Sequence, residues 1–137
     1  MSATQNSNFI NGEWSNNGQA FDSINPSNIN DCLGSFSAAT SDDCKLAIQS
    51  AKNAFQKWSL SSLEERKKIL DFIGSELIVK SPELGEIIAK EEGKPLAEGI
   101  GEVYRSGQFF QYFGAEVLRQ MGEITSSVRA NINVEVT

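Results

Sequence analysis

Histidine is absent from this sequence, and cysteine is scarce. With no histidine among its 137 residues, the chain cannot build a Ser-His-Asp or Cys-His catalytic pair, or a zinc site that contains histidine. The two cysteines, Cys32 and Cys44, are too far apart in the sequence for the C-x-x-C spacing of metal and redox motifs. We expect both thiols to fill the core, Cys44 on the apolar face of a helix.

Long apolar runs and an excess of positive charge are also missing. No stretch reaches the ~18 apolar residues that a membrane span requires, and the opening residues MSATQNSNF lack the basic and apolar regions of a secretory signal. The formal net charge of −6 argues against binding to nucleic acid, which normally needs a basic patch. We therefore expect a globular cytoplasmic protein with neither nucleic-acid nor membrane partners.

The first forty residues carry the turn signals of short strands. An Asn-Gly pair between short apolar pairs is the strongest short-range signal for a β-hairpin, and it occurs at Asn11-Gly12. Further Gly, Pro and Asn residues mark turns between strand-like runs. The other expected features are a turn at Asn17-Gly18, a strand over Ala20–Ile24, a turn at Asn25-Pro26 and a strand over Cys32–Ala38.

Helices are predicted next, because apolar residues recur at steps of three and four. Thr40 or Ser41 can cap the first helix. A capping box over Ser61–Glu64 opens the second, which runs to about Lys80. Ser81-Pro82-Glu83 starts the third, with Ser81 as its cap, and Gly93 ends it as a C-cap.

A fourth and very long helix is predicted over Pro95–Met121, with Pro95 in its first turn. Four glycines interrupt its pattern, and each costs about 1 kcal/mol relative to alanine inside a helix. A helix that tolerates this cost is expected to have its backbone closely approached by another element. The glycines concerned are Gly99, Gly101, Gly107 and Gly114.

In the last residues the spacing of apolar side chains changes from that of a helix to that of a strand. Ile132, Val134 and Val136 alternate with polar residues, which predicts a strand with one apolar face that runs to Thr137. No turn or return strand is expected for it, so its edge would leave unpaired backbone groups. Another part of a larger protein, or another chain, would have to cover that edge.

Taken in order, these motifs resemble the N-terminal segment of an NAD(P)-dependent aldehyde dehydrogenase. The resemblance covers the chain from about Phe9 to Thr137. The segment EEGKPLAEGIGEVYRSGQFF (residues 91–110) is most similar to the branch of the family that oxidises α-ketoglutaric semialdehyde. The motifs that carry the resemblance are FINGEW (Phe9–Trp14), SINP (Ser23–Pro26), AFQKW (Ala54–Trp58), LEERKKIL (Leu63–Leu70), EEGKPLAEGIGEV (Glu91–Val103), FFQYFGAE (Phe109–Glu116) and VEVT (Val134–Thr137).

The resemblance implies an α/β fold in which β-hairpin and strands, four helices and an oligomerisation-type strand follow one another. Residues 1–40 would be β-rich, 41–121 helical and 122–137 a strand arm, all within the cofactor-binding and oligomerisation domains. The complete enzyme would be a homo-oligomer that oxidises a small-molecule aldehyde to a carboxylate with NAD or NADP. The partners of this chain would then be the remainder of the dehydrogenase or its other subunits.

The resemblance also places the catalytic residues outside this chain. The family's oxyanion-hole asparagine, glycine-rich cofactor turn, general-base glutamate and nucleophilic cysteine would all follow Thr137. We therefore expect no catalytic and no cofactor-binding residue here, no cofactor bound by the chain alone and no activity from it. The alternative is a non-catalytic interaction protein that docks on full-length dehydrogenase subunits.

One ion site of the family would fall partly within the chain. Many members hold a monovalent cation with backbone oxygens before the Asn-Pro turn and with an acidic residue before the Gly-Lys pair. The matching residues are Ser23, Ile24 and Glu91, which would bind K⁺ or Na⁺. A simple turn beside an exposed glutamate at a helix end is the alternative reading, and both remain open on the sequence.

Overall fold

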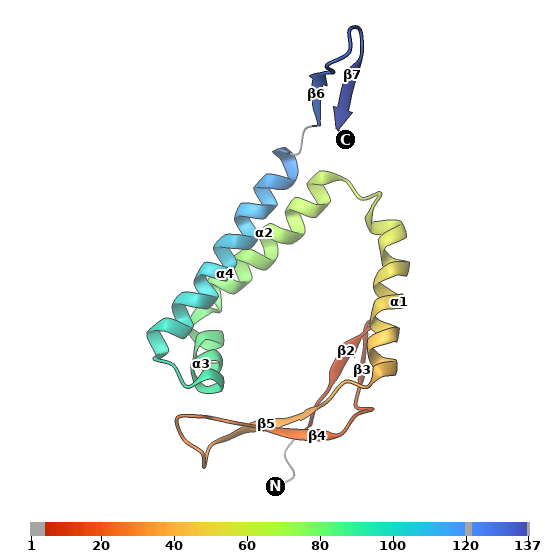
Figure 1. Cartoon of the computed structure of the whole chain (residues 1–137). Coiled ribbons are helices and arrows are strands. Elements are labelled where there is room, and N and C mark those ends of the chain that lie inside the picture. The colour runs from red at the N-terminus through yellow and green to blue at the C-terminus, as the bar shows by residue number, and fades with distance from the viewer. Residues whose placement is uncertain (1–4, 120–121, 137) are drawn as a thin grey trace.

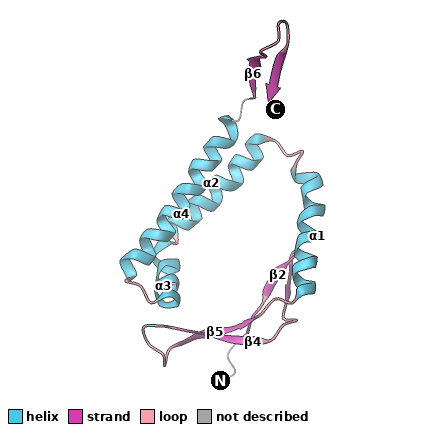
Figure 2. Ribbon diagram, viewed as in Figure 1, coloured by secondary structure: helices cyan, strands magenta, loops and turns pink. Residues whose placement is uncertain are grey.

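The structure is a computed structural model that describes residues 5–119 and 122–136. Short strands come first, four α-helices follow, and a hairpin lies near the C-terminus (Figures 1 and 2). The strands are β1 (Gln5–Asn6), β2 (Asn8–Ile10), β3 (Glu13–Ser15), β4 (Ala20–Ile24), β5 (Cys32–Ser37), β6 (Glu123–Ser126) and β7 (Asn133–Val136). The helices are α1 (Ser41–Trp58), α2 (Leu63–Val79), α3 (Ser81–Glu92), α4 (Leu96–Glu116) and a 3₁₀ turn, η1 (Val117–Arg119).

The N-terminal strands form two small sheets. β2 and β3 pair as the predicted hairpin, and its turn residues Asn11 and Gly12 have φ of 54° and 82°. Strand β5 is central in the other sheet, with β4 antiparallel on one side and β1 parallel on the other. Strand β1 was not predicted, because two polar residues show no alternation of apolar side chains.

Helix α1 begins at Ser41, and Thr40, one of the two predicted caps, is its N-cap. The Thr40 hydroxyl accepts from the Asp43 backbone N–H (3.1 Å), and Asp43 Oδ2 accepts from the Thr40 backbone N–H (2.8 Å). Asn17 Nδ2 donates to Asp43 Oδ1 (2.8 Å), which ties the second predicted turn to the start of the helix. The apolar face of α1 remains open, with Phe55 64% exposed.

The expected burial of both cysteines is wrong. Cys32 and Cys44 are free and exposed. Cys44 lies on the predicted apolar face of α1, but no other helix of the described chain packs against that face. Figure 1 shows α1 standing apart from the other helices, which explains the exposure.

The starts of α2 and α3 differ from the sequence pattern by one residue. Ser62, rather than Ser61, is the N-cap of α2 and accepts from the Glu65 backbone N–H (3.1 Å), while the Ser61 hydroxyl donates to the Trp58 carbonyl (2.7 Å). Lys80, rather than Ser81, is the N-cap of α3. Side-chain hydrogen bonds to the preceding turn compete with capping, and here they occupy the predicted cap residues.

Helices α2, α3 and α4 pack on one another through glycine. A Cβ added to Gly74 of α2 would lie 2.7 Å from the Gly107 carbonyl oxygen of α4, and one added to Gly107 would lie 2.7 Å from the Gly74 carbonyl oxygen. A Cβ added to Gly99 of α4 would likewise lie 2.4 Å from the Gly85 carbonyl oxygen of α3. The predicted close approach is thus confirmed at these positions, whereas Gly101 faces open space.

The fourth helix is shorter at both ends than the sequence predicts. Pro95 is the N-cap rather than a residue of the first turn, and α4 ends at Glu116 before the 3₁₀ turn η1. Met121, the predicted end, lies outside the described residues. Val103 is the one buried apolar side chain among the described residues, at 4% exposure, so the core lies where α4 crosses its neighbours.

The C-terminal strand has a partner, contrary to expectation. β6 pairs antiparallel with β7, and the connecting segment closes with a Ser127 N–H bond to the Ile132 carbonyl (2.9 Å). Asn131 supplies the left-handed turn residue, with φ of 61°. Strand β6 is not predicted from the sequence, because Ile124 is the one apolar residue among its four and no alternation can be recognised. Thr137, the expected end of this strand, lies outside the described residues.

Candidate functional site

The segment that follows β4 is a turn folded around Asn25. The Asn25 backbone N–H donates to the Asp31 carbonyl (3.0 Å), and its Nδ2 donates to Asp31 Oδ2 (3.0 Å). Asn25 Oδ1 accepts from the Ser27 backbone N–H (2.9 Å). Asn25 is buried, so the turn has a fixed shape. Ser23 and Ile24, two of the predicted cation ligands, directly precede it.

This turn docks against the end of α3. The Ser27 hydroxyl donates to the Gly93 carbonyl (3.1 Å), and a Cβ added to Gly93 would lie 2.8 Å from Pro26 Cγ. Gly93 is the C-cap of α3 with φ of 69°, as its sequence position predicted. Glu91, the third predicted ligand, stands two residues earlier and is exposed. The fold thus brings together the two chain segments that carry the predicted ligands.

The backbone around Ser23 and Ile24 is irregular. Ser23 pairs with Gly34 of β5, but Ile24 pairs with Cys32, so the register shifts between them. Such an irregularity turns backbone groups away from the ladder, and carbonyl oxygens are the ligands that hard cations take. No described residues form a cluster of three or more Asp, Glu or Cys side chains that could hold a metal. Backbone oxygens would have to supply most of the ligands.

Charges along the adjoining groove are already paired. The groove has a volume of about 340 Å³ and is bordered by the docked turn, α3 and the start of α4. Lys94 contacts Glu102 and Glu92, each at 2.6 Å. These hydrogen bonds raise the pKa of Lys94, and the bond to Glu102 has the larger effect. Lys90 contacts Glu86 at 2.7 Å, which lowers the pKa of that glutamate. The groove therefore offers little net charge to an anion.

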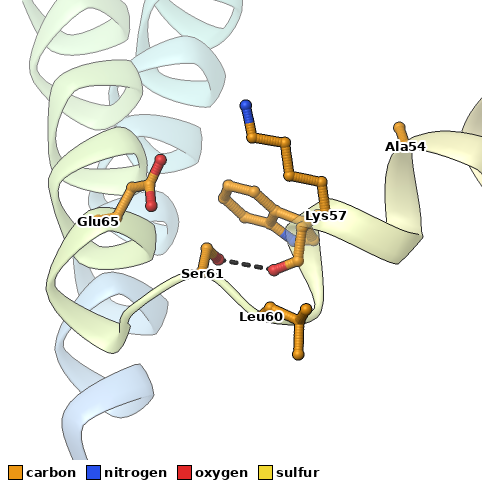
Figure 3. Close-up of a pocket in the computed structure, with 6 residues that line it drawn as sticks. Ala54, Lys57, Leu60, Ser61 and Glu65 are labelled. Atoms are coloured by element: carbon orange, nitrogen blue, oxygen red, sulfur yellow. Dashed lines mark hydrogen bonds between the residues drawn. The ribbon is translucent and has the colours of Figure 1, made fainter.

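A second pocket, of about 570 Å³, lies at the corner between α1 and α2 (Figure 3). The Arg66 guanidinium stands 5.9 Å from the centroid of the Trp58 ring and donates to the Ser59 carbonyl (2.9 Å), which fixes the corner. Figure 3 shows Lys57 and Glu65 on the two helices that border the pocket. The lining includes Leu60, which is 86% exposed, and the hydroxyl of Ser61, which donates to the Trp58 carbonyl (2.7 Å).

The sequence of the chain matches one known family. The family model described as "Aldehyde dehydrogenase family" matches residues 14–137. The chain belongs to the aldehyde dehydrogenase family. This result confirms the resemblance that the ordered motifs indicated.

Curated aldehyde dehydrogenases match over most of the chain. Aldehyde dehydrogenase family 7 member A1 of Pisum sativum is 40% identical over 103 residues, 75% of this chain and 20% of the relative. Succinate-semialdehyde dehydrogenase [NADP(+)] GabD of Escherichia coli is 36% identical over 116 residues, 83% and 24% of the two chains. Alpha-ketoglutarate semialdehyde dehydrogenase of Haloferax volcanii is 31% identical over 129 residues, 93% and 27%. The chain thus spans about a quarter of their length.

Solved structures similar to this chain share its fold, and one of them is an aldehyde dehydrogenase. An Escherichia coli NADP-dependent enzyme superposes with a TM-score of 0.84 at 34% identity, covering 94% of this chain and 27% of that one. Betaine aldehyde dehydrogenase of Staphylococcus aureus, solved with NAD⁺, superposes with a TM-score of 0.82 at 27% identity, covering 94% of this chain and 26% of that one. The mixed α/β architecture with four helices, the last one long, is therefore the N-terminal part of the aldehyde dehydrogenase fold. None of the described helices is long and apolar enough to cross a membrane.

Proposed function

We propose that this chain is the N-terminal part of an NAD(P)-dependent aldehyde dehydrogenase that oxidises an aldehyde to a carboxylate. The observation that carries the proposal is the family match over residues 14–137. We assign the β-rich residues 1–40, the helical residues 41–121 and the strand arm 122–137 to the cofactor-binding and oligomerisation domains. The complete enzyme is proposed to be a cytoplasmic homo-oligomer.

The part that this chain plays in the proposed enzyme is structural. The reaction requires a thiolate, amide donors for an oxyanion and a carboxylate that activates water, and bound NAD or NADP supplies the hydride acceptor. The proposal assigns none of these groups to the chain. Exposed aromatic side chains support this role, because the rest of a dehydrogenase would cover them: Phe55 is 64% exposed, Phe109 57% and Phe113 58%.

For the substrate, we propose an aldehyde that carries a carboxylate, with α-ketoglutaric semialdehyde as the first candidate. Support comes from two relatives whose names specify semialdehydes of dicarboxylic acids, namely succinate and α-ketoglutarate. The test compares α-ketoglutaric semialdehyde with an aldehyde of equal length that lacks the carboxylate. A preference in kcat/KM of at least about tenfold is expected from one charge-assisted hydrogen bond. Equal kcat/KM values would refute the proposed substrate class.

Two measurements test the assignment to a larger dehydrogenase. Sequencing the gene and transcript across the codon for Thr137 should reveal an in-frame continuation, and a stop codon would contradict the assignment. The purified 137-residue chain should form no NADH or NADPH from any aldehyde, whereas the same chain extended by its downstream residues should. Turnover by the short chain alone would refute the predicted inactivity.

A second candidate function is an interaction protein that docks on full-length dehydrogenase subunits. The exposed β6–β7 hairpin favours it, because Val134 and Val136 are 49% and 57% exposed and the outer strand edges invite strand addition. Co-elution of the chain with a full-length aldehyde dehydrogenase would support this function. If the two proteins elute separately, the interaction hypothesis fails.

We also propose that backbone oxygens of Ser23 and Ile24, together with Glu91, contribute to a K⁺ or Na⁺ site in the complete enzyme. The docking of the Asn25 turn on Gly93 supports the proposal, because it brings these segments together. Replacing KCl by choline chloride should lower the melting temperature of the complete enzyme, and Glu91→Gln should reduce that difference. An identical melting temperature in both salts would rule the site out.

A further inference from the structure

The turn of the β2–β3 hairpin exposes an Asn-Gly pair. Asn11 and Gly12 both have left-handed backbones and both are exposed. Apart from the two neighbouring residues, no described residue has an atom within 4 Å of a Cβ built on Gly12. Because glycine has no side chain, its backbone nitrogen is the least hindered nucleophile that can follow an asparagine. The turn is therefore open to solvent at both residues, and no other described part of the chain covers Gly12 where a Cβ would lie.

The side chain of Asn11 has a hydrogen-bond donor on its carbonyl oxygen. Ser50 Oγ, on helix α1, donates to Asn11 Oδ1 at 2.7 Å. A donor at this place withdraws electrons from Cγ and stabilises the negative charge that develops on Oδ1 when a nucleophile adds to the amide. We propose that Asn11 is a modification site, at which the chain loses the side-chain amide spontaneously with Ser50 as the oxyanion donor.

The reaction needs only water as a co-reactant. The Gly12 backbone nitrogen gives up its proton and bonds to Asn11 Cγ, forming a tetrahedral oxyanion on Oδ1. The bond from Cγ to Nδ2 then breaks, and Nδ2 leaves as ammonia with the proton that the backbone nitrogen lost. Water opens the resulting succinimide at either carbonyl carbon and yields aspartate or isoaspartate at position 11.

The chain contains its own matched control at Asn17-Gly18. There the amide group is held in place, because Asn17 Nδ2 donates to Asp43 Oδ1 (2.8 Å). The backbone is also shielded: Gly18 is half-buried, and a Cβ built on it would lie 1.7 Å from the Ala38 carbonyl oxygen. The two pairs have the same residues, but only the pair at Asn11 is both open and supplied with an oxyanion donor.

Conversion of Asn11 to isoaspartate would weaken the attachment of the hairpin to α1. The Asn11–Ser50 hydrogen bond joins the turn to the helix, beside the contacts that β2 makes with α1. Isoaspartate inserts an extra backbone carbon into a two-residue turn whose register pairs Ile10 with Glu13. Register in a hairpin depends on turn length, so the pairing of β2 with β3 would be disturbed.

The test follows ammonia loss at both pairs in one sample. The folded chain is incubated at mildly alkaline pH, and peptide mapping by mass spectrometry measures conversion at positions 11 and 17 over time. Conversion at Asn11 should clearly outpace that at Asn17, and isoaspartate should appear there. In denaturing urea the two rates should become similar, because both pairs have the same neighbour. Equal rates in native buffer, or faster conversion at Asn17, would overturn the proposal.

Substitutions at position 50 separate the donor from simple exposure. Ser50→Ala should slow conversion of Asn11 by roughly 2- to 10-fold, the range that one neutral hydrogen bond supplies. Ser50→Thr keeps the hydroxyl and should retain most of the rate. Gly12→Ala should slow the reaction in folded and denatured chains alike. If Ser50→Ala leaves the rate unchanged or raises it, Ser50 is not the oxyanion donor.

Discussion

Replacing Gly107 by alanine tests whether backbone contact between α2 and α4 organises the helical part of the chain. The new Cβ would lie 2.7 Å from the Gly74 carbonyl oxygen and 2.7 Å from Ile78 Cγ1. One of these neighbours is backbone and cannot move alone, so the helices must separate. Overpacking of this kind costs about 1–3 kcal/mol.

The size of the effect follows from comparison with Gly101. Alanine is better than glycine in a helix by about 1 kcal/mol, and this gain applies at both positions. At Gly101 no described atom beyond the nearby backbone of α4 and the two neighbouring residues lies within 4 Å of the added Cβ, so Gly101→Ala should stabilise the chain by about 1 kcal/mol. Because both variants gain the same helix propensity, this gain cancels when their free energies of unfolding are compared. Gly107→Ala should therefore be less stable than Gly101→Ala by about 1–3 kcal/mol.

Urea denaturation followed by far-UV circular dichroism measures this difference. The midpoints are compared at unchanged slope, since a changed slope would signal a different folded or unfolded state. Repeating the titration at a second protein concentration controls for self-association, which shifts the midpoint. Identical midpoints for Gly107→Ala and Gly101→Ala would refute close packing of the two helices as a source of stability.

Three further predictions concern single residues. Hydrogen bonds from the backbone N–H and hydroxyl of Thr40 hold the pKa of Asp43 below its ordinary value of 3.8. Its contribution to stability is thus complete above that value and is lost as the pH falls further, so acid titration of the melting temperature should be flatter in Asp43→Asn. Gly93→Ala should cost about 1–2 kcal/mol from the left-handed backbone alone, measured by urea denaturation, and an unchanged midpoint would contradict that geometry. Cys32 and Cys44 should both react with a thiol reagent without denaturant, because both are exposed, and protection of either would show that it is covered.

Local signals in the sequence predicted the elements well where one strong rule applied. The Asn-Gly turn, the Thr40 cap and the Gly93 C-cap depend on a few neighbouring residues, and the structure has all three. The caps of α2 and α3 moved by one residue, because Ser61 and Ser81 donate to carbonyls of the preceding turn. Competition of this kind depends on side-chain geometry and cannot be derived from spacing.

Burial was predicted less well, because it depends on partners that the sequence pattern does not identify. Cys44 follows the apolar period of α1, yet no other helix of the described chain covers it. The glycines of α4 indicated its close contacts with α2 and α3, which occur at Gly107 and Gly99. The ligand set of Ser23, Ile24 and Glu91 came from family resemblance alone, and carbonyl ligands leave no signature in the residue types.

The contact between Ser27 and Gly93 has a consequence for the order in which the chain can fold. It joins residues 66 positions apart, so the loop that must close is long. The glycine contact of Gly85 with Gly99 joins residues much closer in sequence. Local contacts form faster than distant ones. During synthesis the N-terminal strands leave the ribosome first, but their turn has nothing to dock on until the end of α3 emerges.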